Sequence, residues 1–225
     1  VSKPLPSFQR PPVVEVALSV QFDAIKDLRA PLLGLLWNEM KDQFPIIREH
    51  PPLEPVYERF GVTIDAMKRG VQLRMIDSPP PQRCWFENEA GTQLVQVQND
   101  RFIHNWRKTS DEANYPRYET LRETFATELD RFLRFIQGRQ LGTLVPNQCE
   151  VTYVNHIVAG EGWKDHTELA KIFSIIGSRF SDDFLSKPED ARFDFRFVIP
   201  NASGKSVGRL HVHAEPVFRT DDLVP

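Results

Sequence analysis

The chain has few of the residues that cross-link small proteins or mark an exported one. Its two cysteines, Cys84 and Cys149, are too few for a disulfide framework in 225 residues and are consistent with a reducing compartment. No apolar run approaches the ~18 residues of a membrane-spanning helix. Residues 1–12 also lack the apolar core of a signal peptide. We therefore expect a cytoplasmic protein without membrane contact.

Motifs of the common catalytic and cofactor sites are missing as well. The chain has no Walker loop, no GxGxxG, no GxSxG elbow, no HExxH and no CxxC. Its net charge of -3 gives no global attraction to nucleic acid or to an anionic membrane. These absences favour a protein without cofactor and without catalysis, although enzymatic activity stays an open alternative.

What is present is typical of a globular protein. Hydrophobic residues make up 40% and charged residues 26% of the chain. Its length suffices for one large domain or two small ones. The 18 prolines against 11 glycines indicate rigid loops. We expect two parts, residues 1–145 and 146–225, packed as one compact unit.

The first part alternates strand patterns with two amphipathic helices. Apolar residues recur every second position in 13–22, which predicts a half-buried strand. Residues 30–44 and 117–136 have helical spacing. Five short strands are expected between them, separated by turn residues that include Asn99-Asp100: 56–66, 70–77, 83–88, 92–98 and 101–108.

The second part begins the same order again. We expect a strand at 149–158, a helix at 165–176 with Asp165 and Glu168 in capping-box spacing, and strands at 192–200 and 208–218. The predicted fold is α+β, a mainly antiparallel sheet with helices on one face and a duplicated strand-helix-strands module. The second module is short, so either the chain continues beyond residue 225 or the copies have diverged. A homodimer that completes the module is a further hypothesis.

Three stretches resemble a sporadically distributed bacterial family of uncharacterised proteins. They are PPVVEVALSVQF near the start, LVQVQNDRFIHNWRK followed by YPRYETLRETF, and VTYVNHI in the second part. Family members are typically about 250 residues long, the size of one or two domains. The resemblance implies a chain that continues into further strand and helix, and it implies no established activity, cofactor or catalytic residue.

One candidate site lies on the polar side of a hairpin between 192–200 and 208–218. Alternation places Asp194, Arg196, His211, His213 and Glu215 on one side, opposite Phe193, Phe195, Phe197, Leu210, Val212 and Ala214. Two imidazoles two residues apart, with a carboxylate as third ligand, are suited to a metal ion. The same pattern is produced by any strand with one wet face, and Arg196 would repel a cation. We favour no metal here and keep a ligand-binding surface as the alternative.

A second candidate site joins Trp106 and Arg107, at a strand end, to Tyr115 and Arg117, at a helix start. Aromatic and basic side chains together are suited to a nucleotide or an acidic partner. However, Phe102, His104 and Trp106 share one strand face, so Trp106 also fits a core position. Cys84 is interpreted as a buried apolar residue rather than a nucleophile.

The sequence thus favours a non-enzymatic binding module. Its ligand, an unknown protein or small molecule, would be recognised by the open sheet face or by a groove between the modules. The first alternative is a metal-dependent enzyme using His211, His213 and Glu215. The second is nucleic-acid binding, which the charge disfavours.

Overall fold

The elements of the chain group into two compact units. The computed structural model describes residues 8–61, 82–110, 113–174 and 191–217. The first unit comprises residues 1–57 and 63–156, and the second comprises 58–62 and 157–225. The division after residue 156 places residues 146–156, which the sequence assigned to the second part, in the first unit.

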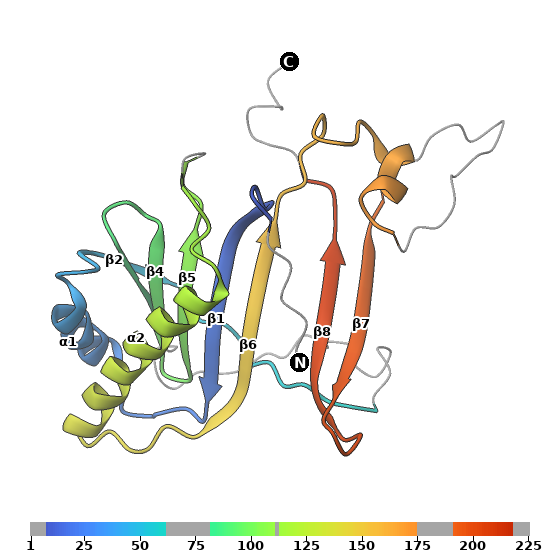
Figure 1. Cartoon of the computed structure of the whole chain (residues 1–225). Helices are drawn as coiled ribbons and strands as arrows, with labels where there is room; N and C mark the ends of the chain where they lie inside the picture. The colour runs from blue at the N-terminus through green and yellow to red at the C-terminus, as the bar shows by residue number, and fades with distance from the viewer. Residues whose placement is uncertain (1–7, 62–81, 111–112, 175–190, 218–225) are drawn as a thin grey trace. The chain divides into compact units, whose positions relative to one another are not determined.

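The first unit contains a six-stranded antiparallel sheet (Figure 1). Its strand order is β2-β3-β4-β5-β1-β6. The strands are β1 (Val13–Phe22), β2 (Ile46–His50), β3 (Arg83–Glu87), β4 (Gln93–Gln98), β5 (Arg101–Arg107) and β6 (Pro146–Asn155). The mainly antiparallel sheet predicted from the sequence is confirmed. The expected two-residue hairpin is also present, because Gln98 pairs with Arg101 across Asn99 and Asp100.

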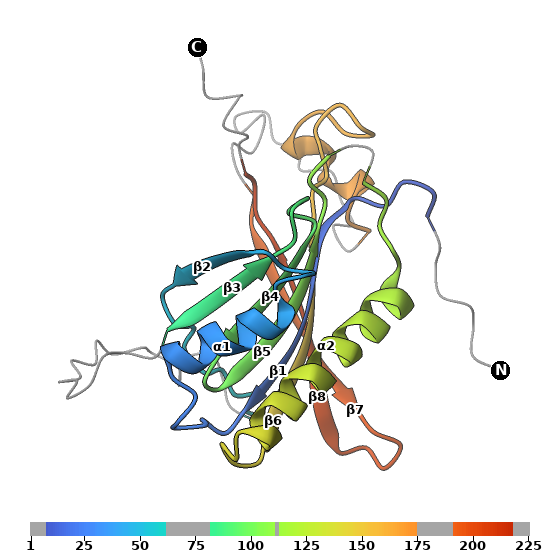
Figure 2. The same ribbon diagram turned by 90° about the vertical axis from the view of Figure 1, so that its left-hand side faces the viewer.

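Two helices, α1 (Ala30–Met40) and α2 (Tyr118–Gly138), cover one face of this sheet (Figure 2). The core between them joins α1 side chains such as Leu36, α2 side chains such as Phe132, and strand side chains such as Phe86 and Phe102. Helix α1 ends before the predicted residue 44, where the indole Nε1 of Trp37 donates to the carbonyl of Phe44 at 2.9 Å. That bond closes the turn after the helix.

Cys84 also belongs to this core. Burial raises the pKa of its thiol to about 11. A thiol in that state lacks the thiolate that a nucleophile requires, which supports the interpretation of Cys84 as a packed apolar residue.

The proline-rich region after α1 differs from the prediction. The strand lies at 46–50, while residues 51–60 contain no regular strand where one was expected from residue 56 onward. Pro51, Pro52 and Pro55 each lack a backbone donor, so this stretch cannot continue a ladder. Strand β2 itself has no apolar alternation, because three of its five residues are polar. The strand expected at 70–77 lies outside the described residues.

The second unit contains a hairpin of β7 (Phe193–Pro200) and β8 (Ser206–Ala214). In place of the predicted helix at 165–176, the described residues form a 3₁₀ helix, His166–Lys171. Asp165 accepts from the Thr167 amide at 3.0 Å, but Glu168 accepts from Lys164 rather than from Asp165. The capping box is therefore incomplete, and the duplication stays a prediction. Among the described residues no helix combines the length and apolarity needed to cross a bilayer.

His104 on β5 points into the core of the first unit and generates a prediction about acid stability. Its side chain is fully buried, and neither ring nitrogen has a hydrogen-bond partner. Burial lowers the pKa of its imidazole to about 4. Between pH 4 and the ordinary pKa near 6.5 the unfolded chain therefore binds a proton that the folded chain excludes.

We expect the free energy of unfolding to fall as the pH drops below about 6.5, by up to about 1.4 kcal/mol per pH unit from this group. A His104→Phe variant should lose this part of the dependence in urea denaturation between pH 7 and pH 4.5. His166→Phe, in the second unit, is the matched control and should keep it. Equal slopes for His104→Phe and the wild type would contradict the assignment.

Candidate functional site

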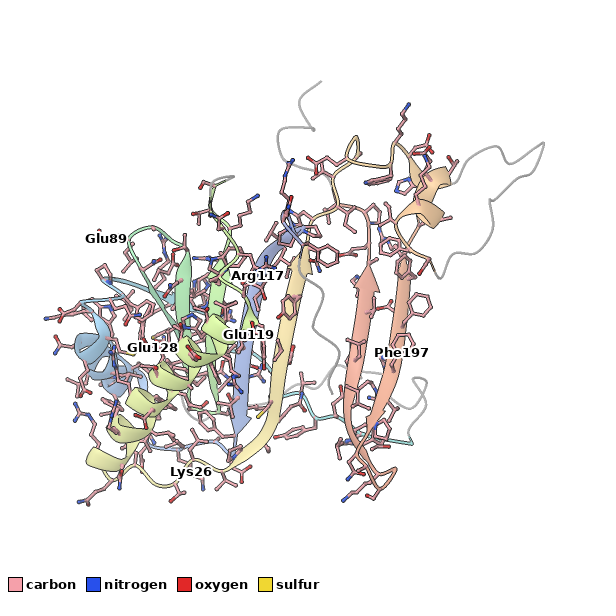
Figure 3. The ribbon with its side chains drawn as sticks, viewed as in Figure 1. Lys26, Glu89, Arg117, Glu119, Glu128 and Phe197 are labelled. Carbon is pink, nitrogen blue, oxygen red and sulfur yellow. The ribbon has the colours of Figure 1, made fainter. Side chains whose placement is uncertain are left out.

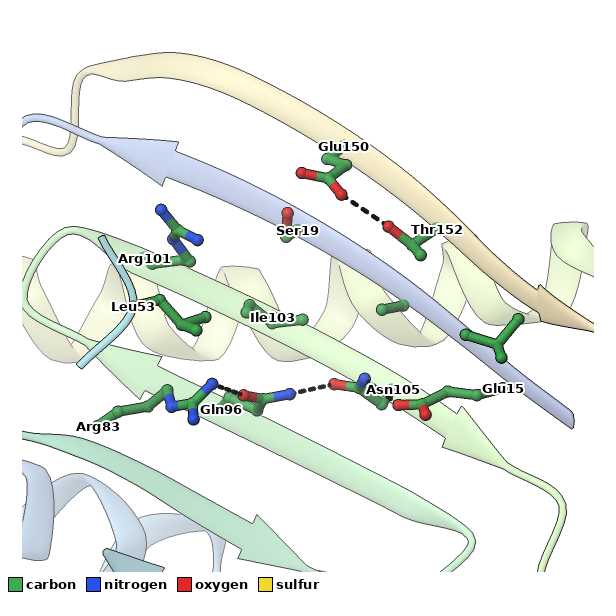
Figure 4. A pocket seen from close by; sticks show the side chains of 12 residues that line it. Glu15, Ser19, Leu53, Arg83, Gln96, Arg101, Ile103, Asn105, Glu150 and Thr152 are labelled. Carbon is green, nitrogen blue, oxygen red and sulfur yellow. Dashed lines mark hydrogen bonds between the residues drawn. The ribbon is translucent and has the colours of Figure 1, made fainter. Parts of the chain in front are cut away.

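The face of the first sheet opposite α1 and α2, here called the open face, carries a depression of about 260 Å³ (Figure 4). Side chains from β1, β3, β4, β5 and β6 meet in it, together with Leu53 from the segment after β2. Alternation directs them there, because their strand neighbours point into the helix-covered core. The lining residues are Glu15, Ala17, Ser19, Leu53, Arg83, Gln96, Arg101, Ile103, Asn105, Glu150, Thr152 and Val154.

A row of hydrogen bonds crosses four strands along one side of the depression (Figure 4). Arg83 Nη1 donates to Gln96 Oε1 at 3.0 Å, and Gln96 Nε2 donates to Asn105 Oδ1 at 2.8 Å. Asn105 Nδ2 donates to Glu15 Oε1 at 2.6 Å. Both amides are buried. The row therefore links a guanidinium to a carboxylate through two neutral groups and holds all four side chains in place.

The two arginines that line the depression bond to neutral acceptors. Besides the Arg83 bond, Arg101 Nη2 donates to Gln21 Oε1 at 2.6 Å and to the Glu54 carbonyl at 3.0 Å. The Nε atoms of both arginines are buried and lack a partner. Burial, and then the charge of Arg101, lower the pKa of Arg83, so the two cations lie near each other. Neither forms an ion pair with a carboxylate of the described residues.

Two carboxylates line the same depression. Glu15 accepts from Asn105, and Glu150 accepts from Thr152 Oγ1 at 2.7 Å. These donors are neutral, and within the described ranges neither carboxylate forms an ion pair. The depression is thus lined by two positive and two negative side chains that do not pair with one another.

An extended segment, residues 51–57, is attached to the open face beside the depression by two glutamines. Gln98 accepts from the Leu53 amide at 2.8 Å and donates to the Leu53 carbonyl at 3.0 Å. Gln21 makes the same pair of bonds to Val56, at 2.9 and 3.0 Å. Each side-chain amide therefore replaces the strand partner that Pro-containing backbone cannot find in a ladder.

In the second unit, β7 and β8 pair as an antiparallel hairpin. Asp194 is opposite His213 and Arg196 is opposite His211, so these four polar candidates lie on one side, and Glu215 follows the end of β8. Asp194 Oδ1 and His213 Nδ1 are 2.7 Å apart, and Glu215 Oε2 lies 3.6 Å from His213 Nε2. The bond to Asp194 is the main cause that raises the pKa of His213.

His211 has a different partner, Glu58. Its Nε2 lies 2.6 Å from Glu58 Oε1, while the other oxygen of Glu58 pairs with Arg209. The two histidines therefore contact separate carboxylates. In the part of the chain that the structure describes, no three His, Cys, Asp or Glu side chains are grouped to hold a metal ion.

The aromatic and basic candidates are divided between the two faces of the first sheet. Trp106 is buried on the helix-covered face, 5.5 Å from the Tyr115 ring. Arg117, beside the start of α2 (Figure 3), donates to the Phe8 carbonyl at 3.0 Å and lies 5.9 Å from the Tyr115 ring. Arg107 is on the open face and pairs with Glu87 at 3.2 Å. The sequence interpretation that joined all four into one surface is therefore corrected.

Sequence reasoning missed Arg83, Arg101, Gln96, Asn105 and Glu150. A signal was present, because Glu15, Ser19 and Gln21 alternate with core residues in 13–22. Alternation alone identifies a half-buried strand and does not indicate a site on its polar side. Only the strand order brings the polar sides of β4, β5, β1 and β6 into one surface.

Gln21 generates a prediction about the stability of the open face. Replacing it with leucine leaves the Val56 amide and carbonyl and one Arg101 donor without partners. We expect Gln21→Leu to lower the free energy of unfolding by about 1–3 kcal/mol in urea titration. Ser19→Ala, on the same strand face, should stay within about 0.5 kcal/mol of the wild type. A Gln21→Leu value as small as that of Ser19→Ala would contradict the role of these bonds.

The Asp194–His213 contact generates a prediction about titration. Asp194→Asn removes the negative charge and the strongest acceptor of His213, so we expect the imidazole pKa to fall toward its ordinary value. NMR titration of the His213 ring protons measures this directly. The ring-proton shifts of His156, which lies outside the hairpin, should be the same in the variant and the wild type. An unaltered His213 pKa would show that Asp194 does not set it.

No family model matches the chain, and neither a curated protein nor a solved structure matches it. The likeness to the bacterial family therefore stays a prediction. The function has to be argued from the geometry of the described residues.

Proposed function

We propose that the chain is a non-enzymatic binding module whose open face takes a small polar ligand in the depression. The observation that carries this proposal is the pair of guanidinium groups, Arg83 and Arg101, that line the depression and bond to neutral acceptors. Both arginines are only partly buried, and neither forms an ion pair with a carboxylate of the described residues. Their remaining N–H donors are therefore suited to an anionic group of a ligand.

The rigidity of the depression supports the same function. Its floor is formed by strands, and its polar side chains are fixed by hydrogen bonds to one another. Binding sites on regular elements with locked side chains lose little entropy when a ligand arrives. Small side chains at Ala17 and Ser19 leave the space, while Arg101 and Glu150 surround it.

The two alternatives have less support. For a metal-dependent enzyme, His211 and His213 would have to converge with Glu215, but they contact Glu58 and Asp194. For nucleic-acid binding, the basic and aromatic candidates would have to share a surface. Trp106 and Arg107 point to opposite faces of the sheet, and Arg107 is paired. We keep the cytoplasm as the proposed location, supported by the unpaired cysteines Cys84 and Cys149.

Equilibrium dialysis against a cell metabolite extract tests the binding function. The purified chain is dialysed to equilibrium, and compounds enriched on the protein side are identified by mass spectrometry. We expect the wild type to enrich a small polar compound. Ala17→Trp should abolish the enrichment, because an indole at this position fills the depression.

The control is a double variant, His211→Ala with His213→Ala, which alters the hairpin and should bind like the wild type. Circular dichroism melting shows whether the Ala17→Trp variant is folded. If it is not, Ser19→Phe is used to fill the depression instead. Equal enrichment by wild type and filled variants, or none by the wild type, would refute the proposal.

A further inference from the structure

We propose that two copies of the chain associate through β6, which pairs antiparallel with β6 of the second copy across a two-fold axis at Val151. The free edge of the first sheet is thus covered by a second copy of the same chain, and the two sheets become continuous. The inference does not depend on the ligand proposed for the depression. Its basis is an unprotected strand edge whose residues are complementary to themselves.

The two outer strands of the first sheet differ in how they are protected. Among the described strands, β2 pairs only with β3 and β6 only with β1, so each leaves one row of backbone N–H and C=O groups unpaired. Strand β2 has five residues, the last three are Arg48, Glu49 and His50, and two prolines follow. Short length, charge and proline all prevent a strand edge from pairing with another chain.

Strand β6 lacks this protection over most of its length. It has ten residues, of which nine are exposed. Its one charged residue is Glu150, and its one proline, Pro146, is at the first position. Val151, Tyr153 and Val154 are 46%, 42% and 39% exposed. A long apolar edge of this kind is suited to pairing with a further strand, because a strand satisfies its free backbone groups.

The regular part of the β1–β6 ladder fixes the position of the two-fold axis. Irregularities interrupt this ladder near both ends, and between them Gln148–Val154 pairs with β1 without a shift. The middle residue of this stretch is Val151. An axis at Val151 therefore pairs every residue of the stretch with a residue of the same stretch in the second copy. Any other position of the axis leaves some of these residues unpaired.

This register also matches the side chains. Val151 and Tyr153 lie on the helix-covered side of the sheet, because their partners on β1 are the core residues Leu18 and Val16. Directly opposed residues share one side of a sheet, so both stay on that side in the dimer. The pairs between the copies are Val151–Val151, Tyr153–Cys149, Thr152–Glu150 and Val154–Gln148. No pair opposes like charges, which would destabilise the sheet.

The size of the interface limits its affinity. In seven paired residues, alternate residues direct their backbone groups toward the second copy, which gives about six intermolecular hydrogen bonds. An interface of one strand from each copy is at the low end of the sizes found for specific complexes. We therefore expect a dimer that dissociates in the micromolar range.

Sedimentation velocity of the full chain, from about 1 to about 200 μM, tests the inference. Val151→Lys opposes two ammonium groups at the axis, and Val151→Asp opposes two carboxylates. Each should weaken self-association at least about tenfold. An equal mixture of the two variants should associate again, because lysine then opposes aspartate. Leu35→Lys, at an exposed position of α1, is the matched control and should associate like the wild type.

Cross-linking tests the register and uses the exposed Cys149. Tyr153→Cys places a thiol opposite Cys149 of the second copy, with Cα atoms about 5 Å apart, which a disulfide can span. Within one strand, positions 149 and 153 are about 13 Å apart and cannot be bridged. Mild oxidation should therefore give a covalent dimer. Tyr153→Cys combined with Cys149→Ser should stay uncross-linked.

A wild-type chain that remains monomeric at about 200 μM would overturn the inference. A dimer that Val151→Lys leaves unchanged would do the same, as would variants that are folded by circular dichroism but do not associate when mixed. If a lysine or aspartate variant does not fold, the cross-link decides, and its absence in Tyr153→Cys refutes the pairing. Positions 151 and 153 do not line the depression, so ligand enrichment in dialysis is judged separately.

Discussion

The alternation of side chains along β1 is the constraint on which the first unit depends. Val16, Leu18 and Val20 are buried on the helix-covered face, and the residues between them form the floor of the depression. A shift of one residue in pairing with β5 or β6 would exchange the two sets and expose the core. Because β1 pairs with both strands, its register fixes the core and the depression together. The binding surface therefore has the rigidity of the fold.

Neutral amides decide how the charges of the open face are used. Gln21, Gln96, Gln98 and Asn105 are buried, and their hydrogen-bond partners include backbone groups, the two arginines, one another, and the carboxylates of Glu15 and Asp100. An amide can hold a guanidinium in position without neutralising it, whereas a carboxylate would do both. Substituting glutamate at Gln96 would give Arg83 an internal counter-ion and remove its availability to a ligand. Amides at these positions therefore leave the guanidinium charge available to an anionic ligand.

The sequence predicts well what depends on local pattern and poorly what depends on strand order. Alternation places β1 at 13–22, and it places Asp194 and His213 on the same side of the hairpin. Strand β2 is missed because Ile46–His50 has no alternation and is a strand only through its pairing with β3. The depression is missed because it depends on strand order. Arg83 and Glu150 line the same depression only once the sheet is assembled.

The second unit shows what the same residue types do when they pair. In the hairpin, Asp194 contacts His213, and Glu58 contacts both His211 and Arg209. These contacts are largely exposed, so each adds little stability. They nevertheless pair His211, His213 and Asp194 within the chain, although the sequence pattern indicated these side chains as ligand-binding candidates. In the depression, strand order and register place Arg83 and Arg101 away from Glu15 and Glu150, and no ion pair joins them among the described residues. Separation of charge, rather than the number of charged residues, is therefore what favours the depression over the hairpin as the binding site.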